Sequence, residues 1–349
     1  MFGKKLLALC FIIMFAGPAF GDTIALKADH PERYVVKKGD TLWDISARFL
    51  RDPWRWPDVW EFNPQIENPH LIYPGDVIIL TYREGKPILS VQRGGEQQIK
   101  TIKLTPKVRK IQVSRAIPTI PISAIKQFLA KPRVISEREM MNSPYIVSSK
   151  GEHLIVGSDD EIYARGIPQG KDTQYSVYRT GRAYRNPGAR DEEILGYEAI
   201  YVGDARIKSY GDPATLQLID ASREALIGDR LLPRIERGID QFFLPHAPDT
   251  AINGNIIAVV DGVSRIGQYQ TVVINLGEFD GIERGHVLAV YQKGEVVRDV
   301  VSDDPRAKVK LPDTRSGLAM VFRTFDRVSY ALIMDAQRDM QLYDVVKNP

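Results

Sequence analysis

Apolar and polar positions near the N-terminal end follow the pattern of a small βααβ unit. Residues 34–37 alternate as a short strand does, and Lys38-Gly39-Asp40 follows as a turn. Thr41 then stands at a helix N-cap with Asp44 three residues later, and the apolar residues after it recur at helical spacing. We therefore expect one strand and one amphipathic helix of about two turns in this stretch.

A second helix and a second strand complete the pattern. Pro57 suits the first turn of a helix, and the acidic Asp58 suits its positively polarised end. Asn63-Pro64 ends this helix, Pro74-Gly75 predicts a turn, and residues 77–80 form a continuous apolar strand. The order β-α-α-β predicts an α+β fold for this unit.

All four tryptophans of the chain belong to this short unit. Trp60 shares a helical face with Val59 and is expected in the core. Trp43, one residue beyond the cap region, fits a core or a surface position. Trp54 and Trp56 lie in the loop between the helices and are compatible either with a structural role or with a contact surface. A domain of about 50 residues without disulfides needs large apolar side chains, which favours the structural role.

The composition changes at Arg83, where a basic stretch punctuated by prolines begins. Residues 83–141 hold 13 lysines and arginines against four glutamates. We interpret residues 83–143 as a connector with a short helix near residues 123–130. Its charge suits either an anionic polymer or an acidic partner, and a solvated linker explains it equally well.

Two later segments, 144–234 and 255–349, resemble each other. Four pieces of the two segments match in order with slowly growing offset, and in the third of them Gly203 aligns with Gly317 and Ile219 with Ile333. Both segments are rich in Val, Ile and Tyr and turn at Gly, Asp and Pro. We predict two mainly-β repeats, each a small barrel or sandwich.

The first 21 residues have the layout of a secretory signal peptide. Lys4 and Lys5 precede an apolar run over residues 6–16, which is too short to span a bilayer. The single cysteine, Cys10, lies inside this run, so the remainder has no disulfide and no thiolate metal site. No later stretch has the length of a membrane span. The sequence therefore predicts an exported, periplasmic protein that does not span the membrane.

The segments YVVKKGDTLWDISARFL and HLIYPGDVIIL, within Arg33 to Tyr82, resemble the LysM domain family. The resemblance implies binding of peptidoglycan through its N-acetylglucosamine-containing glycan, in a groove between two loops. Backbone amides suit the acetamido group, and apolar side chains suit its methyl and the sugar face. The positions that the resemblance assigns to this groove are Gly39, Asp40, Thr41, Leu42, Asn68, Pro69, His70, Leu71, Ile72 and Tyr73.

The C-terminal half carries a second resemblance. INLGEFDGIERGHVLAVY is similar to the C-terminal β-domain of flagellar assembly protein T, and GYEAIYVGDA and MVFRTFDRVSYALIM are similar to secretin-associated proteins of type IV pilus systems. These resemblances imply a cell-wall-bound protein that docks on the outer-membrane secretin, with a ring of copies as one arrangement. A general wall-bound scaffold for another partner, such as a flagellar component, is the alternative. We expect no nucleic-acid partner.

Catalytic patterns are not found in the sequence. The five histidines are scattered singly, without HxH or HExxH spacing, and we interpret them as loop, surface or turn residues. Adjacent acids such as Asp159-Asp160 and Asp303-Asp304 point to opposite sides of a strand or lie solvated in loops. We therefore expect no enzyme, no metal site and no cofactor.

Overall fold

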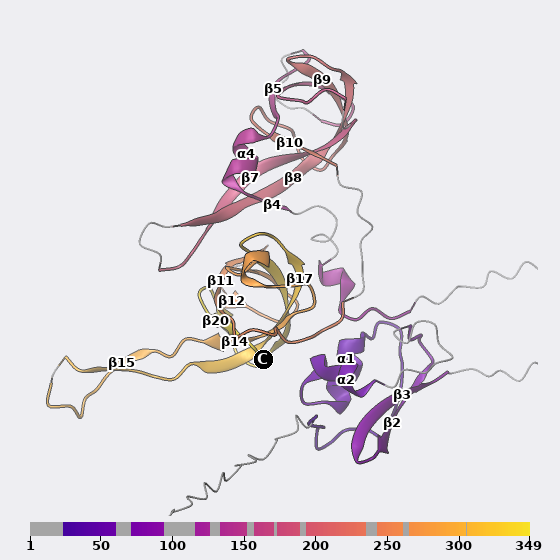
Figure 1. Ribbon diagram of the computed structural model, residues 1–349, viewed down its shortest axis with the longest axis vertical. Coiled ribbons are helices and arrows are strands. Elements are labelled where there is room, and N and C mark those ends of the chain that lie inside the picture. Colours follow the sequence, from indigo (N-terminus) through magenta and orange to yellow (C-terminus); the bar gives the residue numbers. More distant parts are fainter. Residues whose placement is uncertain are drawn as a thin grey trace, which may run out of the picture.

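The computed structural model shows an N-terminal unit followed by two β-rich units (Figure 1). The N-terminal unit comprises residues 24–93, the first β-unit residues 133–234 and the second β-unit residues 243–349. The structure describes residues 24–60, 71–93, 116–125, 133–151, 157–170, 173–188, 193–234, 243–260, 265–304 and 306–349. The signal peptide expected at residues 1–21 lies outside these ranges. No helix in the described ranges is long and apolar enough to cross a bilayer.

The N-terminal unit packs short helices against a three-stranded antiparallel sheet of order β1-β2-β3. Its elements are β1 (Arg33–Val35), α1 (Leu42–Phe49), η1 (Pro53–Arg55), α2 (Trp56–Val59), β2 (Val77–Arg83) and β3 (Lys86–Gln92). The βααβ order expected from the sequence is present. Strand β3, in the range that we assigned to the connector, extends the sheet because Glu84 and Gly85 both adopt positive φ and turn the chain into a hairpin.

Tryptophan side chains hold this small unit together and connect it to the rest. Trp56 is fully buried and meets Trp60 edge to face, with ring centroids 5.8 Å apart. Trp60 is buried in the same core, as expected, but not on a helical face. Helix α2 ends at Val59 instead of reaching Asn63, and Trp60 has an extended backbone that pairs with Leu89. Trp43 is also buried, but it packs with residues of the second β-unit, and the half-buried Trp54 lies against the same cluster.

The first β-unit is a ring of six strands with a seventh strand outside it. Its strands run in the order β4-β8-β7-β10-β5-β6-β9, and pairing of β8 with β9 closes the ring. The elements are β4 (Arg133–Ile135), α4 (Glu137–Asn142), β5 (Tyr145–Ser149), β6 (Glu161–Arg165), β7 (Gln174–Arg185), β8 (Ile194–Ser209), β9 (Ala214–Ala221) and β10 (Arg230–Pro233).

The second β-unit is a closed six-stranded barrel of order β11-β13-β18-β17-β14-β20. Its strands are β11 (Asn253–Val259), β12 (Arg265–Ile266), β13 (Thr271–Ile274), β14 (Val287–Gln292), β15 (Val296–Arg298), β16 (Lys308–Lys310), β17 (Thr314–Thr324), β18 (Ser329–Ala336), β19 (Met340–Gln341) and β20 (Val345–Lys347), with a short η2 (Glu278–Asp280). Numbering the ring strands of each unit from one to six gives the same cyclic order, as the predicted repeat requires.

Equivalent glycines mark the alignment of the two units. A Cβ on Gly203 would lie 2.2 Å from the Asp220 carbonyl oxygen, and one on Gly317 would lie 2.0 Å from that of Asp335. This pairing shifts the expected match of Ile219 by one residue. Ile219 is 39% exposed whereas Ile333 is fully buried, so Leu218, which is also buried, is the structural equivalent of Ile333. The shift arises in the connecting hairpin: five residues separate the paired Ser209 and Thr215, whereas six separate the paired Arg323 and Tyr330.

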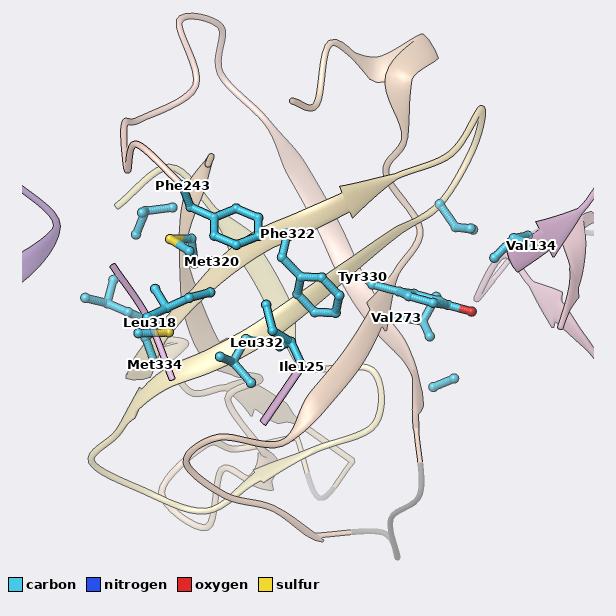
Figure 2. Close-up of a cluster of buried hydrophobic side chains, with 14 of the residues drawn as sticks. Ile125, Val134, Phe243, Val273, Leu318, Met320, Phe322, Tyr330, Leu332 and Met334 are labelled. Carbon is cyan, nitrogen blue, oxygen red and sulfur yellow. The ribbon is translucent and has the colours of Figure 1, made fainter. Parts of the chain in front are cut away.

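The second β-unit is covered on its outside as well as filled within. Alternate residues of β17 belong to two different clusters: Ala319 and Val321 face the interior, while Leu318, Met320 and Phe322 face outward. The outward cluster also contains side chains from the N-terminal unit, the connector and the first β-unit, which identifies it as the outer face. Figure 2 shows this face, including Leu332, Tyr330 and Met334.

Candidate functional site

The first loop of the predicted groove joins β1 to α1 and is fixed by side chains. Gly39 makes the turn at φ +99°, and the Asp40 carboxylate accepts the Lys37 N–H at 2.8 Å and the Tyr34 hydroxyl at 2.9 Å. The Thr41 hydroxyl accepts the Asp44 N–H at 3.1 Å, so it caps α1 as the sequence predicted. The loop is therefore preorganised by local contacts.

The second loop leads into β2 and is held beside the first. The Asp76 carboxylate accepts the Tyr73 N–H and the Arg93 guanidinium, and Arg93 also donates to the Leu71 carbonyl at 2.9 Å. Two backbone hydrogen bonds fasten this loop to β1: the Gly75 N–H donates to Val36 O and the Val36 N–H donates to Asp76 O. Arg93, which directly follows the unexpected strand β3, thus positions the loop.

A segment of the connector lies between the two loops. The Leu42 N–H donates to Pro118 O at 3.0 Å and the Trp43 N–H to Thr119 O at 3.1 Å. On the opposite side, the Ile117 N–H donates to Ile72 O at 2.8 Å. The structure therefore brings the two predicted loops against one common segment, residues 116–119, which we call the connector plug.

The residues predicted for the groove differ in their accessibility. Gly39 is exposed, Asp40 is half-buried and Thr41 is buried at the wall of the open cleft described below. Leu42 and Ile72 are buried in the core of the unit and bond to the connector plug through their backbones. Leu71 is 37% exposed at the rim, next to the half-buried Tyr73. The other predicted positions, Asn68, Pro69 and His70, lie outside the described residues.

An open cleft runs beside the connector plug, between the N-terminal unit and the second β-unit. Its volume is about 1040 Å³, and its walls include Lys38, Asp44, Pro121 and Tyr269. The Tyr269 hydroxyl donates to the Asp44 carboxylate at 3.1 Å. Burial, together with this carboxylate, raises the pKa of Tyr269 to about 12, so the phenol stays protonated and the contact between the units persists at neutral pH.

A cluster of His246, Glu283 and His286 was not expected from the sequence. Their ligand atoms lie within 4.8 Å of one another, and His286, which follows a turn, is buried. The Glu283 N–H donates to Nδ1 of His286 at 3.1 Å. In this arrangement Nδ1 accepts a hydrogen bond, so the neutral imidazole carries its proton on Nε2. His246 and His286 are 40 positions apart in the sequence and meet only in the folded chain. Motifs defined by short spacing, such as HxH or HExxH, therefore do not detect the pair.

No catalytic group is needed to explain the contacts around the predicted groove. Its walls offer backbone N–H groups, one backbone carbonyl and apolar side chains, which are the groups that bind a neutral amide-bearing ligand. The connector plug itself was not anticipated. The signal available in the sequence was the pair Pro118 and Pro121, because a residue before proline favours an extended conformation that exposes its backbone for pairing.

Comparison with known proteins agrees with this geometry for the N-terminal unit. Residues 34–81 match the family model of the LysM domain. A stretch of 55 residues is 40% identical to the uncharacterized protein YqbP of Bacillus subtilis (strain 168), and this match covers 13% of the chain. The chain spans 25% of the length of that relative. The N-terminal unit is therefore a LysM domain, a module that binds peptidoglycan and related carbohydrates.

Proposed function

We propose that this protein is a non-catalytic anchor that is exported to the periplasm and joins an outer-membrane secretin, such as that of a type IV pilus system, to peptidoglycan. The observation that carries the proposal is the LysM domain, whose two loops present backbone amide and carbonyl groups to one narrow groove. The signal-like residues 1–21 and the resemblance of the β-rich region to secretin-associated proteins support the location and the partner.

The arrangement of units suits a mechanical role. One LysM groove binds glycan weakly, but several copies arranged around a ring would engage the wall together, and the effective concentration of the remaining grooves would strengthen attachment. The two β-units contact each other through Arg327 and Glu193 and through the Arg182 guanidinium, which donates to Val259 O at 2.7 Å. A load applied to the β-units can therefore pass along a continuous set of contacts toward the LysM domain.

Co-sedimentation with purified peptidoglycan sacculi tests wall binding. The mature full chain should pellet with sacculi, and Leu71→Gln should weaken pelleting because Leu71 offers apolar surface at the groove rim. Tyr82→Gln is the matched control, since Tyr82 is 60% exposed on β2 outside the predicted groove. Equal loss for both variants, or no pelleting of the unchanged protein, would contradict the proposal. Release of soluble muropeptides would show an enzyme instead.

Cross-linking in living cells tests the partner. Capture of the secretin through the β-units is the expected result. If the secretin is missing and another envelope complex is captured, the alternative of a general wall-bound scaffold, for example for a flagellar component, replaces the pilus proposal.

A further inference from the structure

The protein's own connector occupies the part of the assigned glycan groove that lies between Leu42 and Ile72, beside the open cleft lined by residues 39–41. Both predicted loops form backbone hydrogen bonds with the connector plug: the N–H groups of Leu42 and Trp43 donate to it, and the carbonyl of Ile72 accepts from it. Leu42 and Trp43 are the first two residues of α1, whose N–H groups have no acceptor within the helix. Without the plug these two donors would be open to any carbonyl that enters the groove.

The connector plug presents the same polar groups as an N-acetyl substituent. An acetamido group carries one N–H donor and one C=O acceptor. Ile117 supplies an N–H to the carbonyl of Ile72, and Pro118 supplies a C=O to the amide of Leu42. The side chain of Ile117 is 5% exposed and packs into the core of the LysM domain, where a sugar's methyl group would need an apolar contact. The plug therefore occupies the groove as a chemical equivalent of the glycan.

The second β-unit holds the connector plug in place. Ile120 and Ile125 are fully buried in the outer-face cluster of this unit, together with Trp43 of the LysM domain. The plug and the contact between the LysM domain and the second β-unit are thus one packed assembly, and removing the plug from the groove disturbs both.

We propose that the connector plug is an internal ligand that competes with N-acetylated glycan, so that the LysM domain binds the wall only when the plug leaves the groove. The inference rests on the proposed function, because it concerns regulation of the same groove. The measured glycan affinity of the full chain is then the intrinsic affinity multiplied by the fraction of molecules with an open groove. Separation of the LysM domain from the second β-unit, by a partner or by load, increases that fraction.

Titration of the mature full chain with a soluble N-acetylglucosamine oligomer tests this competition. Ile120→Asp places a charge in the apolar outer-face cluster and should loosen the connector plug without touching the LysM core, which would raise glycan affinity about tenfold or more. Ser123→Asp adds the same charge at an exposed position of the same segment, and it should bind like the unchanged protein.

A conservative variant tests the opposite direction and carries little risk of misfolding. The Thr119 hydroxyl is buried and has no hydrogen-bond partner among the described residues. Thr119→Val removes this unsatisfied group at nearly constant shape, so it should tighten the connector plug and weaken glycan binding about fivefold.

The outcomes separate the two proposals. If Ile120→Asp and Thr119→Val both bind as tightly as the unchanged protein, the competition is wrong and wall binding stands. If Ile120→Asp does not fold, Thr119→Val decides the question alone. If neither the unchanged protein nor a folded Ile120→Asp variant binds the oligomer or sacculi, the proposed function itself fails.

Discussion

The two β-units share a strand order but differ on their outer faces. With Asp220 and Asp335 as equivalents, the outward positions of β9 are Thr215, Gln217 and Ile219. The corresponding positions of β18 are Tyr330, Leu332 and Met334, and all three are buried. One fold therefore serves two purposes. The first unit keeps a partly solvated face, whereas the second has an apolar face that binds the connector and Trp43 of the LysM domain.

Exchanging outward residues between the units should have the largest effect. Leu332→Gln copies the first unit into the second, leaves a buried amide without partners and removes apolar contact, so we expect a loss of about 3–5 kcal/mol of unfolding free energy. The reciprocal Gln217→Leu should stay within about 0.5 kcal/mol, because that position is partly exposed. Denaturant unfolding measures both. Equal losses of unfolding free energy for the two exchanges would show that the outer faces of the two units do not differ in how closely they are covered.

Substitution of the equivalent glycines should destabilise both units to a similar extent. Gly203→Ala and Gly317→Ala each drive a Cβ into a backbone carbonyl oxygen, and we expect each to cost about 2–3 kcal/mol in its own unit. Gly267→Ala is the control, since a Cβ there meets no atom within 4 Å. Thermal unfolding followed by calorimetry checks this. A large effect at only one of the two glycines would refute the structural alignment.

A buried aspartate near the end of each unit sharpens the comparison. Asp229 forms a 3.0 Å ion pair with Arg179, whereas Gln292 occupies the strand position equivalent to Arg179, and the nearby Lys293 is the cation that acts on Asp344. Burial raises the pKa of Asp344 and so favours the protonated carboxyl in the folded protein. The stability that this carboxyl contributes is therefore lost as pH rises through its folded pKa. Arg179→Gln should therefore destabilise the first unit by about 1–3 kcal/mol at neutral pH. Gln292→Arg should raise the melting temperature of the second, and no change in either would contradict the argument.

The histidine pair of the second unit should give the smallest effect, as a dependence on pH. Burial, and then the adjacent His246, lower the pKa of His286 below its usual value of about 6.5. The unfolded chain therefore takes up the proton first, and stability falls as pH decreases from about 7 to 5. His286→Gln should flatten this dependence of the melting temperature. An unchanged slope in the variant would show that another group is responsible.

The sequence predicted what is local and missed what depends on distant contacts. The Thr41 cap, helix α1 and the presence of a second helix follow from local residue spacing. The end of α2 at Val59 did not, because pairing of Trp60 with Leu89 in β3 is a contact between distant residues. The match of Gly203 with Gly317 follows from the steric demand for a residue without a side chain. The alignment of Ile219 was wrong by one residue because the β17–β18 hairpin is one residue longer than the β8–β9 hairpin, and an extra hairpin residue leaves the hydrophobic pattern of the strands unchanged.

The occupation of the candidate groove could not be read from the sequence. Ile117 is separated from Ile72 by 45 positions, and their hydrogen bond joins two backbones, which leaves no trace in side-chain identity. Likewise, Leu332 looks like an ordinary strand residue, and only the packed structure shows that it faces outward and is covered. The family resemblance identified the LysM domain at residues 34–81, but it carried no information about the connector segment that lies between the two predicted loops.

Amide hydrogen exchange at Ile117 tests the central claim most directly. In the free protein this N–H is bonded to Ile72 O at 2.8 Å and should exchange slowly. Saturation with an N-acetylglucosamine oligomer should speed its exchange at least tenfold as glycan replaces the connector plug, while the Ile45 amide inside α1 stays unchanged. Continued protection of Ile117 in the glycan-saturated protein would contradict the account, because plug and glycan would then occupy the domain together.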